Sequence, residues 1–128
     1  MTPVVVVDAS ALAAVVFLEP EAGAVLARLE GRQLVAPTLL AYELTNTALS
    51  KLRRHPAHAA VVRAGLAGVA SGDFAIYWSE VDFEAVLAVA EQTQLTAYDA
   101  AYLWLARHLD ADLVTLDVKL QRAFDRSR

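Results

Sequence analysis

A run of four valines that ends on a carboxylate is the feature that most constrains this chain. Residues 4–7 are all valine, and Asp8 follows them directly, ahead of a stretch rich in alanine. An unbroken valine run of this length is typical of a strand buried on both faces, as in parallel sheets. In such folds, ligand sites lie beyond the carboxyl ends of the strands. Asp8 is therefore the first candidate site residue.

The rest of the chain alternates strand-like and helix-like segments. We expect about four to five strands, of which four are readable, at residues 4–7, 33–37, 74–78 and 112–116. Helices are predicted over residues 10–18, 20–30, 38–54, 57–70, 83–92, 97–109 and 119–124. Ser10 is the expected cap of the first helix. This alternation predicts a three-layer α/β/α architecture around a parallel sheet, in a single domain spanning residues 1–128.

Composition excludes several classes of protein. With 128 residues and 57% hydrophobic side chains, the chain has ample material for one core. No apolar segment approaches the roughly 20 residues of a membrane-spanning helix, and no basic leader precedes the valines, so we expect a cytoplasmic protein without a membrane partner. The absence of cysteine excludes disulfides and thiolate zinc sites. Any bound metal must therefore use oxygen or imidazole ligands.

Three acids stand at the starts of helices or the ends of strands. Asp8 and Asp117 each follow a short apolar strand, so in a parallel sheet both carboxylates emerge at the same edge. Asp99 lies three residues after Thr96, at the start of an otherwise apolar helix. A T-x-x-D pair also fits a simple helix cap, and the sequence alone leaves both interpretations of Asp99 open.

Glu43 lies on a polar stripe of the longest predicted helix. Glu43, Asn46, Thr47 and Ser50 recur at helical spacing beside a separate apolar stripe. This polar stripe uses Asn, Thr and Ser, which are poor helix formers, in place of the Lys, Arg and Gln usual on solvated helices. This composition indicates that the polar stripe lines a cleft.

Four converging carboxylates repel one another unless a cation lies between them. Hard oxygen ligands indicate Mg²⁺ or Mn²⁺. Such an ion polarises a phosphoryl group and lowers the pKa of a bound water, which suits phosphodiester hydrolysis. The net charge of −4 opposes nucleic-acid binding, but once these four of the fifteen acids are set aside, eleven remain to balance eleven lysines and arginines.

Four segments of the sequence together resemble the PIN-domain ribonucleases, and more narrowly the VapC-type toxins of bacterial toxin–antitoxin pairs. These segments are VVVVDASAL, APTLLAYELTNTAL, LTAYDAAYLWLA and DLVTLDVKLQRA, and their order and spacing follow the family across almost the whole chain. The resemblance implies a PIN-like α/β/α fold and an Mg²⁺-dependent endoribonuclease that hydrolyses RNA with a metal-activated water.

Matched residue by residue, the acidic quartet of the family falls on Asp8, Glu43, Asp99 and Asp117. The resemblance implies that Asp8 and Asp99 are the most direct metal ligands. The last acid is the least constant ligand in such enzymes, so Asp117 can act through water.

Other matched positions carry hydroxyl or amide groups. Ser10 and Thr115 match residues that can orient the carboxylates or the bound water, and Asn46 matches a polar position that can support them. Asp112 also lies near the last acid in the sequence, but it starts a strand and is expected at the opposite edge of the sheet.

Partners follow from the resemblance and from the excess of apolar residues. An RNA substrate, a cognate VapB-type antitoxin and a homodimer are implied, and the weakly charged helix over residues 61–70 is a candidate contact. Lys51, Arg53 and Arg54 complement the carbonyl end of their helix or contact RNA phosphates. Three aromatic residues of the penultimate helix are predicted to belong to the core: Tyr98, Tyr102 and Trp104.

Two other functions remain as alternatives. A haloacid-dehalogenase-like phosphatase also begins with a valine strand ending in aspartate, but its chemistry needs a second aspartate where this chain has Ser10. A PIN-like scaffold that binds RNA or protein without cutting is the second alternative, and an intact set of four acids argues against it.

Overall fold

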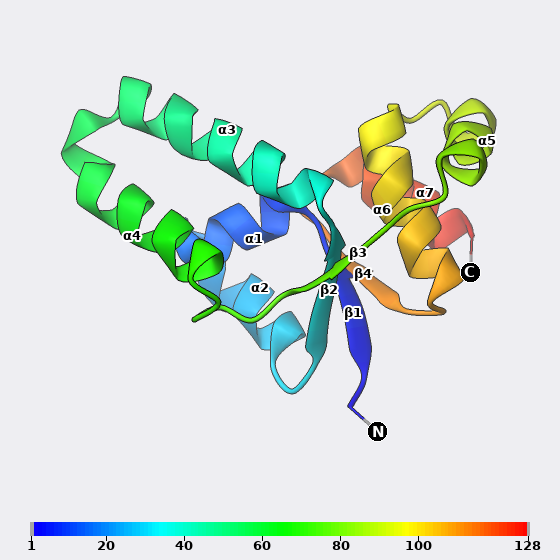
Figure 1. Ribbon diagram of the computed structural model, residues 1–128, viewed down its shortest axis with the longest axis horizontal. Helices are drawn as coiled ribbons and strands as arrows, with labels where there is room; N and C mark the ends of the chain where they lie inside the picture. The colour runs from blue at the N-terminus through cyan, green and yellow to red at the C-terminus, as the bar shows by residue number, and fades with distance from the viewer. Residues whose placement is uncertain (1, 128) are drawn as a thin grey trace.

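The computed structural model describes residues 2–127 and has the predicted α/β architecture. A four-stranded parallel sheet lies between two layers of helices (Figure 1). The first half of the chain forms β1 (Val4–Val7), α1 (Ala9–Val16), α2 (Ala22–Leu29), β2 (Gln33–Pro37), α3 (Leu39–Arg54) and the 3-10 turn η1 (Pro56–His58). The second half forms α4 (Ala59–Ala70), β3 (Tyr77–Ser79), α5 (Phe83–Thr93), α6 (Ala97–His108), β4 (Asp112–Val114) and α7 (Val118–Arg126).

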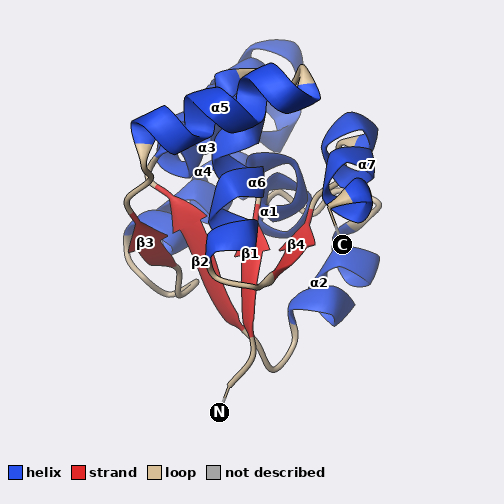
Figure 2. Cartoon of the chain, turned by 90° about the vertical axis from the view of Figure 1, so that its right-hand side faces the viewer, coloured by secondary structure: helices blue, strands red, loops and turns tan. Residues whose placement is uncertain are grey.

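The valine strand β1 lies inside the sheet, as its composition predicts. The strand order is β3-β2-β1-β4, so β1 pairs with β2 on one side and with β4 on the other (Figure 2). All the pairs are parallel, and the register places Val5 beside Leu34 and Val7 beside Val114. The carboxyl ends of β1 and β4 therefore come together at one edge of the sheet.

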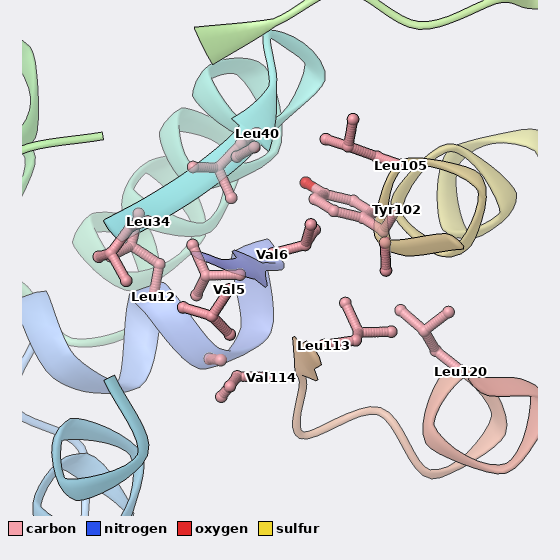
Figure 3. Packing of buried hydrophobic residues seen from close by; sticks show 14 of the residues in the cluster. Val5, Val6, Leu12, Leu34, Leu40, Tyr102, Leu105, Leu113, Val114 and Leu120 are labelled. Carbon is pink, nitrogen blue, oxygen red and sulfur yellow. The ribbon is translucent and has the colours of Figure 1, made fainter. Parts of the chain in front are cut away.

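Two groups of helices cover the two faces of the sheet. Helices α1 to α4 lie on one side and α5 to α7 on the other (Figure 1). The core runs through the sheet and includes Leu12 and Leu40 from the first group and Leu105 and Leu120 from the second (Figure 3). No helix within residues 2–127 has the length and apolar character needed to cross a membrane.

The hairpin of α3 and α4 extends to one side of the molecule (Figure 1). It is held close to α1 at Gly65, where an added Cβ would overlap the carbonyl group of Val16. A side chain at Gly65 would therefore force two packed helices apart.

The structure corrects three of the expected boundaries. Asp8, and not Ser10, caps α1, because the Asp8 carboxylate accepts the backbone N–H of Ala11. The third strand begins only at Tyr77, because Phe74 still donates its N–H to the end of α4 at Gly68. The fourth strand ends at Val114, because the next backbone N–H groups bond to side chains at the candidate site.

Candidate metal and nuclease site

Asp8 is fixed at the carboxyl edge of the sheet by the strand register. Its backbone N–H donates to the carbonyl of Val114 at 3.2 Å, which continues the pairing of β1 with β4. The same register sets Thr115 beside Asp8. Both side chains are buried, each with 5% of its surface exposed.

Two hydroxyl groups hold the two oxygens of the Asp8 carboxylate. Ser10 donates to Oδ1 at 2.7 Å, and Thr115 donates to Oδ2 at 2.5 Å. Ser10 Oγ also accepts the N–H of Leu116, and Thr115 Oγ1 accepts the N–H of Asp117. The hydroxyls thus orient the carboxylate and tie it to the segment that carries the last acid.

Glu43 reaches the same region from α3. It lies in the second turn of α3, which begins directly after β2, and its side chain is half-buried. Tyr102 of α6 donates its phenol hydrogen to Glu43 Oε1 at 2.6 Å. Figure 3 shows the Tyr102 ring among core residues with its hydroxyl directed toward α3. Glu43 is therefore positioned by a group from the opposite helical layer.

Asp99 and Asp117 stand at the amino ends of α6 and α7. Thr96 caps α6 by accepting the N–H of Asp99, as the T-x-x-D pattern predicts. Within residues 2–127, however, the Asp99 carboxylate itself accepts no hydrogen bond, so it does not cap a backbone amide of α6. Asp117 caps α7 by accepting the N–H of Leu120.

Burial and mutual repulsion raise the pKa of three of the four carboxyl groups. Burial is the largest influence on Asp8 and raises its pKa, its three hydrogen bonds lower the pKa, the charge of Asp117 raises it, and the net change is a rise. Burial also raises the pKa of Glu43, with further contributions from Asp99 and Asp8. The pKa of Asp99 rises through burial and through Asp117 and Asp8. The four acids thus form one electrostatically coupled cluster.

The cluster has little positive charge of its own. Among the described residues, no lysine, arginine or histidine forms an ion pair with any of the four acids. Lys119 lowers the pKa of Asp99, but its ammonium group donates to the carbonyl of Gln94. The donor set therefore consists of hard oxygens with unbalanced charge, which suits Mg²⁺ or Mn²⁺.

The carboxylates do not form a closed metal cage. In residues 2–127, no three side chains of His, Cys, Asp or Glu make a group that could by itself hold a metal ion. Mg²⁺ is usually held by one or two carboxylates and keeps several waters, so an open arrangement fits this ion better than it fits a fully protein-coordinated one.

The other predicted site residues fall at different distances from the cluster. Ser10 and Thr115 contact Asp8 directly, whereas Asn46 lies one helical turn from Glu43 and is exposed. Asp112 lies at the amino end of β4, at the opposite edge of the sheet, as expected, and pairs with Arg32 at 3.0 Å.

Sequence reasoning missed the role of one aromatic residue and misplaced another. Tyr102 is buried in the core as predicted, but its hydroxyl contacts Glu43. The signal available was its position three residues after Asp99, on the same side of α6. Tyr98 was expected in the core and is 63% exposed, because it lies in the first turn of α6 beside a surface hollow.

Comparison with known protein families agrees with this geometry. The family model described as the PIN domain matches residues 5–125. The chain belongs to the PIN-domain family. Proteins of this family are generally metal-dependent nucleases, so the coupled acids of this PIN domain lie in a nuclease-type fold.

A solved structure has a similar fold. The crystal structure of PAE2754 from Pyrobaculum aerophilum is 28% identical in sequence and has a TM-score of 0.75, covering 96% of this chain and 86% of that chain. A comparison with curated protein sequences found no match.

Proposed function

We propose that this PIN domain is a metal-dependent endoribonuclease of the VapC type, acting on RNA in the cytoplasm. The observation that carries the proposal is that Asp8, Glu43, Asp99 and Asp117 lie close enough to repel one another, while no lysine, arginine or histidine of residues 2–127 forms an ion pair with any of them. Keeping these acids together and ionised costs free energy, which a divalent cation would offset. Membership in the PIN family supports the same chemistry.

Asp8 and Asp99 would hold Mg²⁺ or Mn²⁺, with Glu43 and Asp117 completing the negative environment. When bound, the ion would polarise the scissile phosphoryl group and supply a water of lowered pKa for its hydrolysis. Ser10 and Thr115 keep both oxygens of Asp8 in a fixed orientation. Tyr102 fixes Oε1 of Glu43, so neither acid needs to reorganise when substrate arrives.

A homodimer and a VapB-type antitoxin belong to this proposal. The main support for a dimer is a cavity of about 760 Å³ between the start of α3, α5 and the start of α6. Phe83 of α5 lines this cavity and is 84% exposed, and Leu87, one helical turn further along α5, is also exposed. This face carries larger exposed apolar side chains than the helix over residues 61–70 that the sequence suggested, where the large exposed apolar side chain is Val61. In sedimentation at micromolar concentration, the wild type should be a dimer and Phe83→Glu should be a monomer. A wild type that sediments only as a monomer would contradict the proposed dimer.

The nuclease is tested by incubating the purified chain, free of any antitoxin, with structured and single-stranded RNAs. Parallel reactions contain Mg²⁺, Mn²⁺ or a chelator. Asp8→Asn is the test variant, because asparagine retains the helix cap and removes the charge. Asp112→Asn is the matched control, because it makes the same chemical change at the other edge of the sheet.

We expect cuts that require metal, that disappear with Asp8→Asn and that persist with Asp112→Asn. Cutting that continues in Asp8→Asn, or in excess chelator, would contradict the proposed chemistry. RNA binding without any cutting or metal binding would favour the non-catalytic scaffold instead.

A further inference from the structure

The polar face of α3 continues away from the acidic cluster. Glu43 is followed along this face by Asn46, Ser50 and Arg54 at spacings of three and four residues. The helix runs outward from the sheet edge to the tip of the α3–α4 hairpin (Figure 1). At a rise of about 1.5 Å per residue, Arg54 lies roughly 16 Å along the helix from Glu43.

Two surface hollows meet at Asn46 and follow this face. The first, of about 280 Å³, is lined by Glu43 and Asn46 together with Leu39, Tyr42 and Tyr98. The second, of about 330 Å³, is lined by Asn46, Thr47, Ser50, Lys51, Arg54 and His55. Both hollows lie along the same face of α3, and together they are here called the α3 track, which begins at Glu43 of the acidic cluster and ends at the basic side chains of Lys51 and Arg54.

Several polar groups of the α3 track are not engaged by the protein. The Thr47 hydroxyl donates to the carbonyl of Glu43, and Lys51 pairs with Glu19. In contrast, Asn46, Ser50 and Arg54 use no side-chain atom in a hydrogen bond or ion pair with the rest of the described chain. Their donors and acceptors are available to a ligand that lies along the helix.

We propose that the α3 track binds the sugar–phosphate backbone of single-stranded RNA on one side of the scissile bond. This inference rests on the proposed nuclease function and identifies the path of its substrate. Arg54 contacts a phosphate, and Asn46 and Ser50 bond to riboses or phosphates between Arg54 and the acidic cluster. A stacked strand advances about 3.4 Å per nucleotide, so the track spans several nucleotides.

The charge distribution explains why RNA can approach an acidic protein. The cluster at one end of the track repels phosphate unless a cation is bound, whereas Arg54 at the other end attracts it. The middle of the track carries neutral amide and hydroxyl groups that bond to RNA without adding charge. Because the two hollows are small, they can accept a single strand of RNA more readily than a duplex.

Arg53 provides a matched control for Arg54. It is adjacent in sequence, exposed and equally placed near the carbonyl end of α3, but it does not line the track. Arg53→Gln and Arg54→Gln therefore change the net charge and the helix-end interaction alike. Only Arg54→Gln removes a cation from the proposed path.

The experiment measures binding of a fluorescent single-stranded RNA to the full chain carrying Asp8→Asn, with and without each arginine substitution, across a range of salt concentrations. We expect Arg54→Gln to weaken binding roughly threefold or more and to reduce the slope of log K against log salt by about 0.7, the value for one phosphate contact on a single strand. Arg53→Gln should leave both quantities close to those of the parent.

Equal effects of the two substitutions, or no effect of either, would overturn the α3 track as the path of RNA. Cleavage by the wild-type chain, measured separately, reports on the nuclease itself. Cutting with an unaltered salt slope in Arg54→Gln refutes only the track. Absence of cutting while the Arg54 dependence of RNA binding persists refutes only the nuclease.

Discussion

Aspartate residues at the two edges of the sheet have opposite environments. At the amino edge, Asp112 pairs with Arg32 at 3.0 Å, and both side chains remain about one-third exposed. At the carboxyl edge, Asp8 is buried beside other acids and accepts hydrogen bonds from two hydroxyls and a backbone N–H. One aspartate is neutralised locally, and the other is oriented without being neutralised.

This difference separates a structural acid from a functional one. An ion pair such as Asp112 with Arg32 needs no external partner. No basic side chain of residues 2–127 balances the charge of the cluster around Asp8. Two hydroxyl groups orient the Asp8 carboxylate without neutralising it. Carboxyl groups whose pKa values are shifted in this way are candidates for binding a cation and for catalysis.

The largest expected contrast is in RNA cleavage. Asp8→Asn and Asp99→Asn should each lower the rate by more than about a hundredfold, because each removes a charged ligand from the cluster. Asp112→Asn should cleave at close to the wild-type rate. Initial rates of cleavage of one RNA at saturating Mg²⁺ measure this contrast. Comparable losses of rate in Asp8→Asn and Asp112→Asn would contradict the assignment of a functional acid to the carboxyl edge and a structural acid to the amino edge.

A smaller loss is expected when the support of Glu43 is removed. Tyr102→Phe deletes the phenol that donates to Oε1, and we expect cleavage to fall about tenfold. Because that hydrogen bond lowers the pKa of Glu43, its loss should also shift the acidic limb of the pH–rate profile to higher pH. Tyr77→Phe is the control, because Tyr77 is exposed on β3 and lines neither hollow of the α3 track, and an unshifted profile in Tyr102→Phe would show that the contact is only structural.

Repulsion between Asp99 and the other acids of the cluster can be tested by measuring the free energy of unfolding. Its folded pKa is raised, so its contribution to stability is present below the unfolded pKa of about 3.8 and is lost as pH rises through the folded value. Asp99→Asn should therefore be more stable than the wild type at neutral pH without metal, by less than about 1 kcal/mol because the side chain is partly exposed. Urea unfolding at several pH values measures the difference, which should vanish toward pH 4. A wild type that is more stable at neutral pH would contradict repulsion.

The smallest effect is expected at the amino edge. Asp112→Asn should destabilise the protein by about 0.5 kcal/mol, the usual magnitude for a partly exposed ion pair. The effect should shrink in high salt, because screening already weakens the pair. Urea unfolding at two salt concentrations checks this, and a salt-independent loss of several kcal/mol would indicate a buried structural role.

The sequence was most informative where a residue's place depends on strand direction. The valine run predicts a parallel inner strand, and that direction alone places Asp8 and Asp112 at opposite edges. Glu43 was identifiable from the polar stripe of Asn, Thr and Ser on its helix, and Asp99 from its place at the start of an otherwise apolar helix, where a helix cap remained the alternative. Their function stays a prediction until cleavage or metal binding is measured.

The contacts between helical layers were beyond the reach of the sequence. The cap of α1 was also misassigned, because Asp8 takes the position expected of Ser10, whereas the hydrogen bond from Ser10 to Asp8 agrees with the role that the resemblance implied. The contact of Tyr102 with Glu43 spans 59 residues. The spacing from Asp99 places Tyr102 on the same side of α6, but it does not identify Glu43 as its partner. Exposure of Tyr98 depends on how α6 packs against α3 and α5, which periodicity does not determine.

The most direct test of the central claim is calorimetric titration of Mn²⁺ into four metal-free proteins: the wild type, Asp8→Asn, Asp99→Asn and Asp112→Asn. We predict saturable binding in the wild type and in Asp112→Asn, and binding weakened at least about tenfold in Asp8→Asn and Asp99→Asn. Equal binding by all four proteins, or no binding by the wild type, would contradict a cation site at the carboxyl edge of the sheet.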